Sequence, residues 1–414
     1  MTGRSATQRS SPRRHPGRAR RRAGSRHSRG PTRPETAAVG RFDSGILAPA
    51  ALLVGGGIVM IYSATAPLAM AESLPPQFVK HVLTVGLAVG CGAVAMRVPL
   101  SVWRKLSLPL WLLSLALLGA TLWLGIEVNS ARRWLPLPGL PFRLQPAELI
   151  KWTTVLVVAS QLAVEGARGT SPRRLWTVLA MTIAPIALML MQPDFGSAAL
   201  LVTLVALLLF AAGTSLRLLA GLGALAGIGT AVFAGANPYA LLRFQAFIDP
   251  WQKSGSEGFQ LVQSFVAFGR GGAFGVGLGD GRQKLFFLPE AHTDFILSVV
   301  AEELGLLGVL LVLGAFGALV VAGTRVARRA RDPFVLLCVF GMTAFIAVPA
   351  FVNAAVVMGL VPTTGFPMPF LSLGGNSLLT CALALGILLR AASREAGPGR
   401  HRVAHAIALG RSTP

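Results

Sequence analysis

The sequence predicts an all-α integral membrane protein, a bundle of about ten transmembrane helices with one long extracytoplasmic loop. Its composition is the first reason: hydrophobic residues make up 53% of the 414 residues and charged residues only 13%, with a mean hydropathy of +0.64. A water-soluble chain of this length carries more surface charge. The second reason is that the apolar residues fall in runs of about 20, the length of helix that crosses a bilayer.

The apolar runs give the expected helices in order along the chain. The predicted spans are residues 45–64, 78–97, 104–126, 147–165, 174–191, 196–213, 217–236, 295–322, 333–358 and 372–391. Gln192-Pro193-Asp194 separates the fifth span from the sixth and predicts a surface turn, with Asp194 as a helix cap. Residues 237–294 form the long loop between the seventh and eighth spans, and their apolar and aromatic content predicts an ordered structure that lies along the membrane.

The distribution of Lys and Arg predicts the orientation in the membrane. If the N-terminus is cytoplasmic, the short inside loops carry most of the basic residues: Arg97, Arg104, Lys105, Arg168, Arg173, Arg174, Arg217, Arg325, Arg328, Arg329 and Arg331. An even number of spans then leaves both termini in the cytoplasm. The predicted domains are a disordered Arg-rich tail at 1–43, the transmembrane domain at 44–392 and a second cytoplasmic tail at 393–414.

The formal charge of +22 does not indicate nucleic-acid binding, because residues 1–41 hold twelve Arg and one Glu and so supply half of it. Cysteine gives no further signal. Cys91, Cys338 and Cys381 lie in three separate apolar runs, which predicts core packing and excludes a disulfide framework or a zinc site.

Two predicted outside loops carry cations against the charge bias. Residues 127–146 contain Arg132, Arg133 and Arg143, and residues 237–294 contain Arg243, Lys253, Arg270, Arg282 and Lys284. Cations on this side of the membrane indicate an anionic ligand there. The alternative is that they pair only with lipid headgroups.

Ionisable residues also stand where the apolar spans begin. Glu148 and Lys151 are three residues apart and share a helical face, either as a structural ion pair or as part of a site. Asp294 precedes the eighth span, where partial desolvation raises the proton affinity of a carboxylate and suits it to act as a general base. The alternative role for Asp294 is a helix N-cap. Glu302 and Glu303 follow about two turns deeper.

Six motifs in order resemble the SEDS family of membrane proteins, named for shape, elongation, division and sporulation. The resemblance covers residues 45–392. The motifs are Asn129–Trp134 (NSARRW), Gln145–Lys151 (QPAELIK), Gln192–Gly196 (QPDFG), Phe247–Trp251 (FIDPW), Leu288–Ile296 with Ala301–Gly305 (LPEAHTDFI, AEELG) and Pro362–Gly375 (PTTGFPMPFLSLGG). Ala291 in the fifth motif is more similar to the division type of the family than to the elongation type.

The resemblance implies a peptidoglycan glycosyltransferase that polymerises lipid II at the outer face of the cytoplasmic membrane, at the division septum. It implies Asp294 as the essential acid and Glu148 and Lys151 as residues of the same cavity. The remaining expected substrate-binding residues are Arg132, Arg133, Arg243, Arg270, His292 and Thr293. The expected partners are undecaprenyl-diphosphate-linked glycan, a class B penicillin-binding protein and other division proteins, with a divalent cation (Mg²⁺ or Mn²⁺) as the one cofactor considered. The alternatives are an elongation-type polymerase, a lipid II flippase and a non-catalytic scaffold.

Overall fold

The computed structural model describes residues 43–69, 74–128, 131–136, 143–164, 171–236, 238–253, 255 and 258–395. These residues lie in one compact unit. The predicted tail at 1–43 falls outside the described residues except for Asp43, whose carboxylate accepts from the Gly45 amide and caps the first helix. At the other end the last helix continues to Glu395, three residues past the predicted domain limit.

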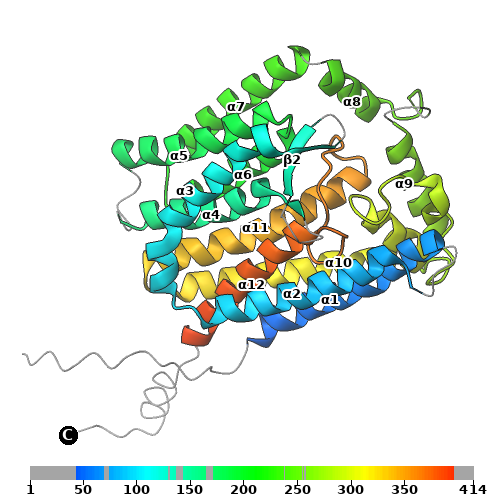
Figure 1. Cartoon of the computed structure of the whole chain (residues 1–414), viewed down its shortest axis with the longest axis horizontal. Helices are drawn as coiled ribbons and strands as arrows, with labels where there is room; N and C mark the ends of the chain where they lie inside the picture. The colour runs from blue at the N-terminus through cyan, green and yellow to red at the C-terminus, as the bar shows by residue number, and fades with distance from the viewer. Residues whose placement is uncertain are drawn as a thin grey trace, which may run out of the picture. The chain divides into compact units, whose positions relative to one another are not determined.

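A helix stands at each of the ten predicted positions (Figure 1). These helices are α1 (Ser44–Thr65), α2 (Pro76–Arg97), α3 (Leu100–Leu124), α4 (Pro146–Leu162), α5 (Pro172–Met191), α6 (Phe195–Ala211), α7 (Leu216–Ala236), α10 (Ile296–Arg329), α11 (Pro333–Val357) and α12 (Gly375–Glu395). Among the described residues seven helices are long and apolar enough to cross a membrane, namely α1, α2, α3, α5, α10, α11 and α12. The chain is therefore a multi-pass membrane protein, and the full number of ten crossings stays a prediction.

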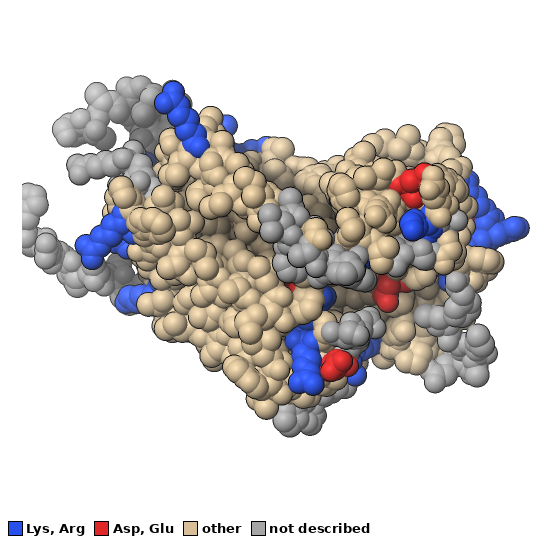
Figure 2. All heavy atoms as spheres, turned by 90° about the horizontal axis from the view of Figure 1, so that it is seen from above, with Lys and Arg blue, Asp and Glu red and all other residues tan. Residues whose placement is uncertain are grey.

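The bundle places α4 at its centre. Helix α4 packs against α3, α5, α6, α11 and α12, and nearly all of its side chains are buried. Helices α1, α2, α10, α11 and α12 run side by side in Figure 1, where α2 packs on α12 and α1 on α10. Figure 2 shows Lys and Arg at both ends of one face with an uncharged band between them. Such a band suits the hydrocarbon layer of a bilayer.

The two loops that carry unexpected cations have regular structure. The first forms a small antiparallel sheet of β1 (Ile126–Val128), β2 (Ala131–Pro136) and β3 (Arg143–Leu144). This sheet is an addition to the predicted all-helical fold, because strands of two to six residues leave no clear periodicity in the sequence. The described residues of the second loop contain α8 (Pro238–Ile248), α9 (Phe259–Gly271) and a π-helical turn at Gln283–Phe287, as the prediction of ordered structure requires.

Helix α10 is broken at Gly305, where φ is 67° and ψ is −163°. A Cβ atom at this position would overlap the Gly275 backbone, so the close approach requires glycine. The segment 272–277 fills the break. The amides of Val276 and Gly277 donate to the carbonyls of Glu302 and Glu303 at 3.0 and 3.1 Å. The backbone groups that the break exposes are thereby paired, as an apolar surrounding demands, and the long loop is held against α10.

Candidate active site

Asp294 lies at the end of the long loop, immediately before Phe295, the N-cap residue of α10. No side-chain hydrogen bond caps this helix, so the structure does not give Asp294 the alternative role of N-cap. Its main-chain carbonyl accepts a hydrogen bond of 2.6 Å from the side-chain amide of Asn353 in α11. Its carboxylate faces Gly365, where a Cβ atom would lie 3.5 Å from Oδ2. The Pro-rich segment 362–370 therefore lies directly beside the carboxylate.

The pKa of Asp294 is raised from 3.8 to about 6: burial raises it most, the neighbouring Glu290 carboxylate also raises it, and Arg243 lowers it. The loss of water around a carboxylate disfavours its charged form. A carboxylate with a pKa near the working pH is well matched to accept a proton during a reaction. Burial also lowers the pKa of His292, against the opposing effect of Glu290, and so favours the neutral imidazole.

Arg243 is the predicted cation that the structure brings to Asp294. It projects from α8, and its Nη1 donates to the carbonyl of Thr363 at 3.2 Å. That contact joins α8 to the same Pro-rich segment that covers the Asp294 carboxylate. The Asp294 carboxylate and the Arg243 guanidinium come from opposite ends of the long loop. Both lie beside the same Pro-rich segment. The arrangement can accept a proton and stabilise a nearby negative charge.

Glu148 and Lys151 form a buried ion pair at the start of α4. Lys151 Nζ lies 2.6 Å from Glu148 Oε1, and the two side chains are only 2% and 9% exposed, respectively. Lys151 Nζ also lies 5.5 Å from the centre of the Phe366 ring, a cation–π distance. The carbonyl of Phe366 accepts from Asn353 Nδ2 at 2.6 Å. The pair is thus linked to Asp294 through Phe366 and Asn353.

Three predicted arginines have local partners instead. Arg132 lies 3.5 Å from Glu127 on the exposed side of the small sheet. Arg133 donates to the carbonyls of Gln192 and Pro193, where α5 ends. Gln192 is the C-cap of α5, where a helix end leaves carbonyls without intrahelical partners, and Pro193 follows it in the turn to α6. The side chains of Arg132 and Arg133 are therefore engaged in holding the sheet and the α5–α6 turn.

Arg270 belongs to a second polar cluster at the break of α10. Its Nη1 lies 3.2 Å from Glu302 Oε1, and the Glu302 side chain is fully buried. Beside it, Lys284 Nζ lies 2.6 Å from Glu303 Oε1. The cations at 270 and 284 therefore neutralise the two buried carboxylates, which explains how adjacent glutamates are tolerated in an apolar helix.

Of the last two predicted residues, Thr293 contacts its own loop and His292 contacts the segment before α12. Thr293 Oγ1 donates to Glu290 Oε2 at 2.6 Å, and the His292 carbonyl accepts from the Leu373 amide at 2.9 Å. The sequence reasoning missed Glu290 and Asn353 as neighbours of Asp294. The signal for Asn353 was present, because it is an amide within an otherwise apolar predicted span.

In the described part of the chain, no group of three His, Cys, Asp or Glu side chains is placed to hold a metal ion. The divalent cation considered from the sequence thus has no site built from such residues in that part of the chain. Magnesium is often held by one or two carboxylates together with substrate phosphates.

The chain is a multi-helix membrane bundle, and its candidate active site holds a half-buried acid beside a guanidinium. These two features are those of a membrane-embedded enzyme. The chain belongs to the cell cycle protein family of FtsW, RodA and SpoVE, whose model matches residues 44–396. It is 40% identical over 368 residues to a probable peptidoglycan glycosyltransferase FtsW of Geobacter metallireducens, covering 86% of this chain and 96% of that protein.

Two solved structures share the fold. One comes from work titled "Structural coordination of polymerization and crosslinking by a peptidoglycan synthase complex"; it has a TM-score of 0.70 and 29% identity, covering 85% of this chain and 98% of that one. The other is the rod shape determining protein RodA of Thermus thermophilus, with a TM-score of 0.63 and 27% identity, covering 85% of this chain and 97% of that one. The resemblance noted in the sequence is confirmed.

Proposed function

We propose that this protein is a peptidoglycan glycosyltransferase that polymerises lipid II at the outer face of the cytoplasmic membrane. Family membership and the naming of its relatives as glycosyltransferases support this activity. The observation that carries it is the geometry at Asp294: a half-buried carboxylate with a pKa of about 6, next to Gly365 and within the electrostatic reach of Arg243.

The reaction joins two sugars and releases a diphosphate. Asp294 accepts the proton of the acceptor sugar hydroxyl while that oxygen attacks the anomeric carbon of the growing strand. The bond from this carbon to the diphosphate oxygen breaks, and undecaprenyl diphosphate leaves with the electron pair. Arg243 stabilises the negative charge that develops on the leaving group. The proton remains on Asp294 until solvent removes it.

Lys151 and Glu148 stabilise this site through the Pro-rich segment that covers Asp294. The ammonium of Lys151 packs on the Phe366 ring, and the Phe366 carbonyl shares Asn353 with Asp294. The Pro-rich segment therefore rests on the buried pair on one side and covers the acid on the other. In this proposal the Glu148–Lys151 pair fixes the position of the Pro-rich segment relative to the Asp294 carboxylate.

The polymerase is proposed to act at the division septum, with both termini in the cytoplasm, together with a class B penicillin-binding protein and other division proteins. The FtsW relatives support the division role over the elongation role. The structural match to a complex that coordinates polymerization with crosslinking supports a transpeptidase partner. Fluorescent fusions in dividing cells test the location: septal bands are expected, and an even lateral distribution would favour the elongation role.

A gel assay of glycan strands tests the activity. The full chain with its partner transpeptidase is given lipid II in detergent, and Asp294→Asn is compared with Asp194→Asn. Asp194 caps α6 through Ser197, and asparagine caps helices equally well, so this control should polymerise normally. Asp294→Asn should form no strands while folding normally. Equal strands from both variants would remove Asp294 from the mechanism, and flipping of lipid II without strands would favour the transporter.

A further inference from the structure

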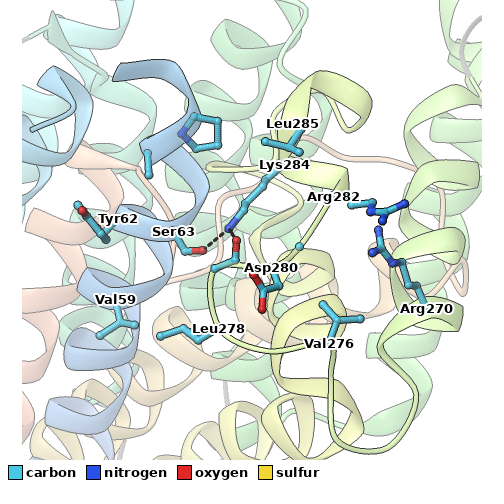
Figure 3. A pocket seen from close by; sticks show the side chains of 14 residues that line it. Val59, Tyr62, Ser63, Arg270, Val276, Leu278, Asp280, Arg282, Lys284 and Leu285 are labelled. Carbon is cyan, nitrogen blue, oxygen red and sulfur yellow. Dashed lines mark hydrogen bonds between the residues drawn. The ribbon is translucent and has the colours of Figure 1, made fainter. Parts of the chain in front are cut away.

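A cavity of about 700 Å³ lies between the end of α1 and the segment 276–285 (Figure 3). Helix α1 lines it with Val59, Tyr62 and Ser63, and the opposite wall carries Arg270, Arg282 and Lys284. Neither Asp294 nor Arg243 is among its lining residues. The cavity is therefore separate from the proposed site of polymerisation. Its own lining residues determine what it can bind.

The lysine of this cavity is fully engaged. Lys284 Nζ donates to Ser63 Oγ and to the Gly279 carbonyl at 2.7 Å, and it lies 2.6 Å from Glu303 Oε1. An ammonium has three N–H donors, and these contacts use all of them. Lys284 therefore ties α1 to the break in α10 and leaves the binding chemistry to other groups.

The two arginines are arranged differently. Glu302 Oε1 accepts from the Arg282 backbone amide at 2.9 Å and from Arg270 Nη1 at 3.2 Å. The guanidinium of Arg282 is exposed and points toward that of Arg270 (Figure 3). Asp280 also lines the cavity but forms an ion pair with neither arginine in the described part of the chain. Two guanidinium groups facing each other are suited to bind one phosphate between them.

The α1 wall gives the cavity an apolar half. Leu52, Val59 and Tyr62 are each 46% exposed, and with Gly55 they follow each other by three or four residues on one face of the helix. A Cβ atom at Gly55 would meet nothing within 4 Å. Because α1 is long and apolar enough to span the membrane, this face is suited to contact acyl chains, and its residues Val59 and Tyr62 line the cavity that also holds the two arginines.

We propose that this cavity binds an anionic membrane phospholipid, with the phosphate between Arg270 and Arg282 and an acyl chain along the α1 face. A charged head and an apolar tail match the two halves of the cavity. Free phosphate would contact only the two arginines and would leave the apolar half of the cavity empty. A polyprenyl diphosphate has both features, but its reaction is assigned to Asp294, whose neighbours do not line this cavity.

Native mass spectrometry of the full chain tests the proposal. Protein in detergent is offered phosphatidylglycerol, phosphatidylcholine, inorganic phosphate or undecaprenyl diphosphate. Phosphatidylglycerol should be retained selectively, and Arg282→Glu should weaken its retention by about tenfold or more, the usual worth of a charge-assisted hydrogen bond. Arg282→Gln should weaken it less. Both variants keep the backbone amide that binds Glu302, so the fold should be unchanged.

Arg173→Glu makes the same charge change at an exposed position at the start of α5. It should retain phosphatidylglycerol as the parent does. Equal retention by parent and Arg282→Glu would overturn the proposal, as would equal loss in both Glu variants, which would indicate a general charge effect. Displacement of the phospholipid by inorganic phosphate alone or by undecaprenyl diphosphate at equal concentration would overturn the assignment to a phospholipid.

Discussion

The side-chain amide of Asn353 holds the main-chain carbonyl of Asp294 at 2.6 Å, joining α11 to the residue before the N-cap of α10. Its second amide hydrogen goes to the Phe366 carbonyl, also at 2.6 Å. One buried side chain thus sets the position of the proposed base and of the segment that covers it. Asn353 acts on the reaction through these two contacts, as a positioning residue.

Substitution of Asn353 by Leu keeps its approximate size but removes both donors. We expect kcat to fall at least about tenfold with little change in KM, because the two carbonyls lose hydrogen bonds worth about 0.5–1.5 kcal/mol each and Asp294 shifts. Steady-state polymerisation kinetics measure this split. Asn376→Ala is the control, since its amide binds the Arg143 carbonyl at the exposed sheet. An unchanged kcat for Asn353→Leu would refute the positioning role.

The pH dependence of polymerisation should follow the ionisation of Asp294. A general base works when deprotonated, so kcat/KM should rise with pH through about 6. Glu290→Gln removes a charge that raises this pKa, so the rise should move to lower pH. Arg243→Met removes a charge that lowers it, so the rise should move to higher pH and the maximum rate should fall. Shifts in the same direction for both variants would contradict this assignment.

The Glu148–Lys151 pair should behave as a buried ion pair. Lys151→Met leaves the Glu148 charge uncompensated at 9% side-chain exposure, and such a change costs about 3–5 kcal/mol. The double variant Glu148→Gln/Lys151→Met should recover most of the stability, measured by thermal unfolding in detergent. Full activity in the folded double variant would make the pair purely structural, whereas lost activity would support its role beneath Phe366.

Gly305→Ala should destabilise the protein by about 1–3 kcal/mol or more, the cost of a strained backbone position. Its φ of 67° disfavours a side chain, and the added Cβ atom would overlap Gly275. Gly314→Ala lies in the same helix, where a Cβ atom meets nothing within 4 Å, so it should be neutral or slightly stabilising. Equal unfolding temperatures for the two variants would show that the break is not needed.

The orientation predicted from charge can be tested with single cysteines after Cys91, Cys338 and Cys381 are replaced. An impermeant maleimide should label Gln252→Cys in intact cells, because the loop before α9 is predicted to lie outside. Arg328→Cys, at the predicted cytoplasmic end of α10, should be labelled only after the membrane is opened. The reverse pattern would place Asp294 inside and exclude polymerisation of external lipid II.

Several elements of the site were visible in the sequence. The motif around Asp294 marked the acid, and the positions of the apolar runs matched all ten helices. The assignment of arginines was less informative. Arg133 and Arg270 were expected to bind an anionic ligand because of their predicted side of the membrane, and the structure adds protein partners that charge bias did not indicate: Arg133 donates to carbonyls at the end of α5 and Arg270 pairs with Glu302. The distribution of Lys and Arg along the chain predicts the side of the membrane on which a loop lies. It does not predict which residue each arginine side chain contacts.

Hydropathy alone locates the membrane helices, because the cost of burying polar groups in hydrocarbon acts on each segment separately. The site depends instead on contacts between distant segments. Asp294 contacts Asn353, which lies 59 residues further along the chain. Arg243, the cation near Asp294, lies in α8 at the other end of the long loop. No local pattern encodes such distances. They arise only when packing of the helices brings the three segments together, and that packing sets the proton affinity of the acid.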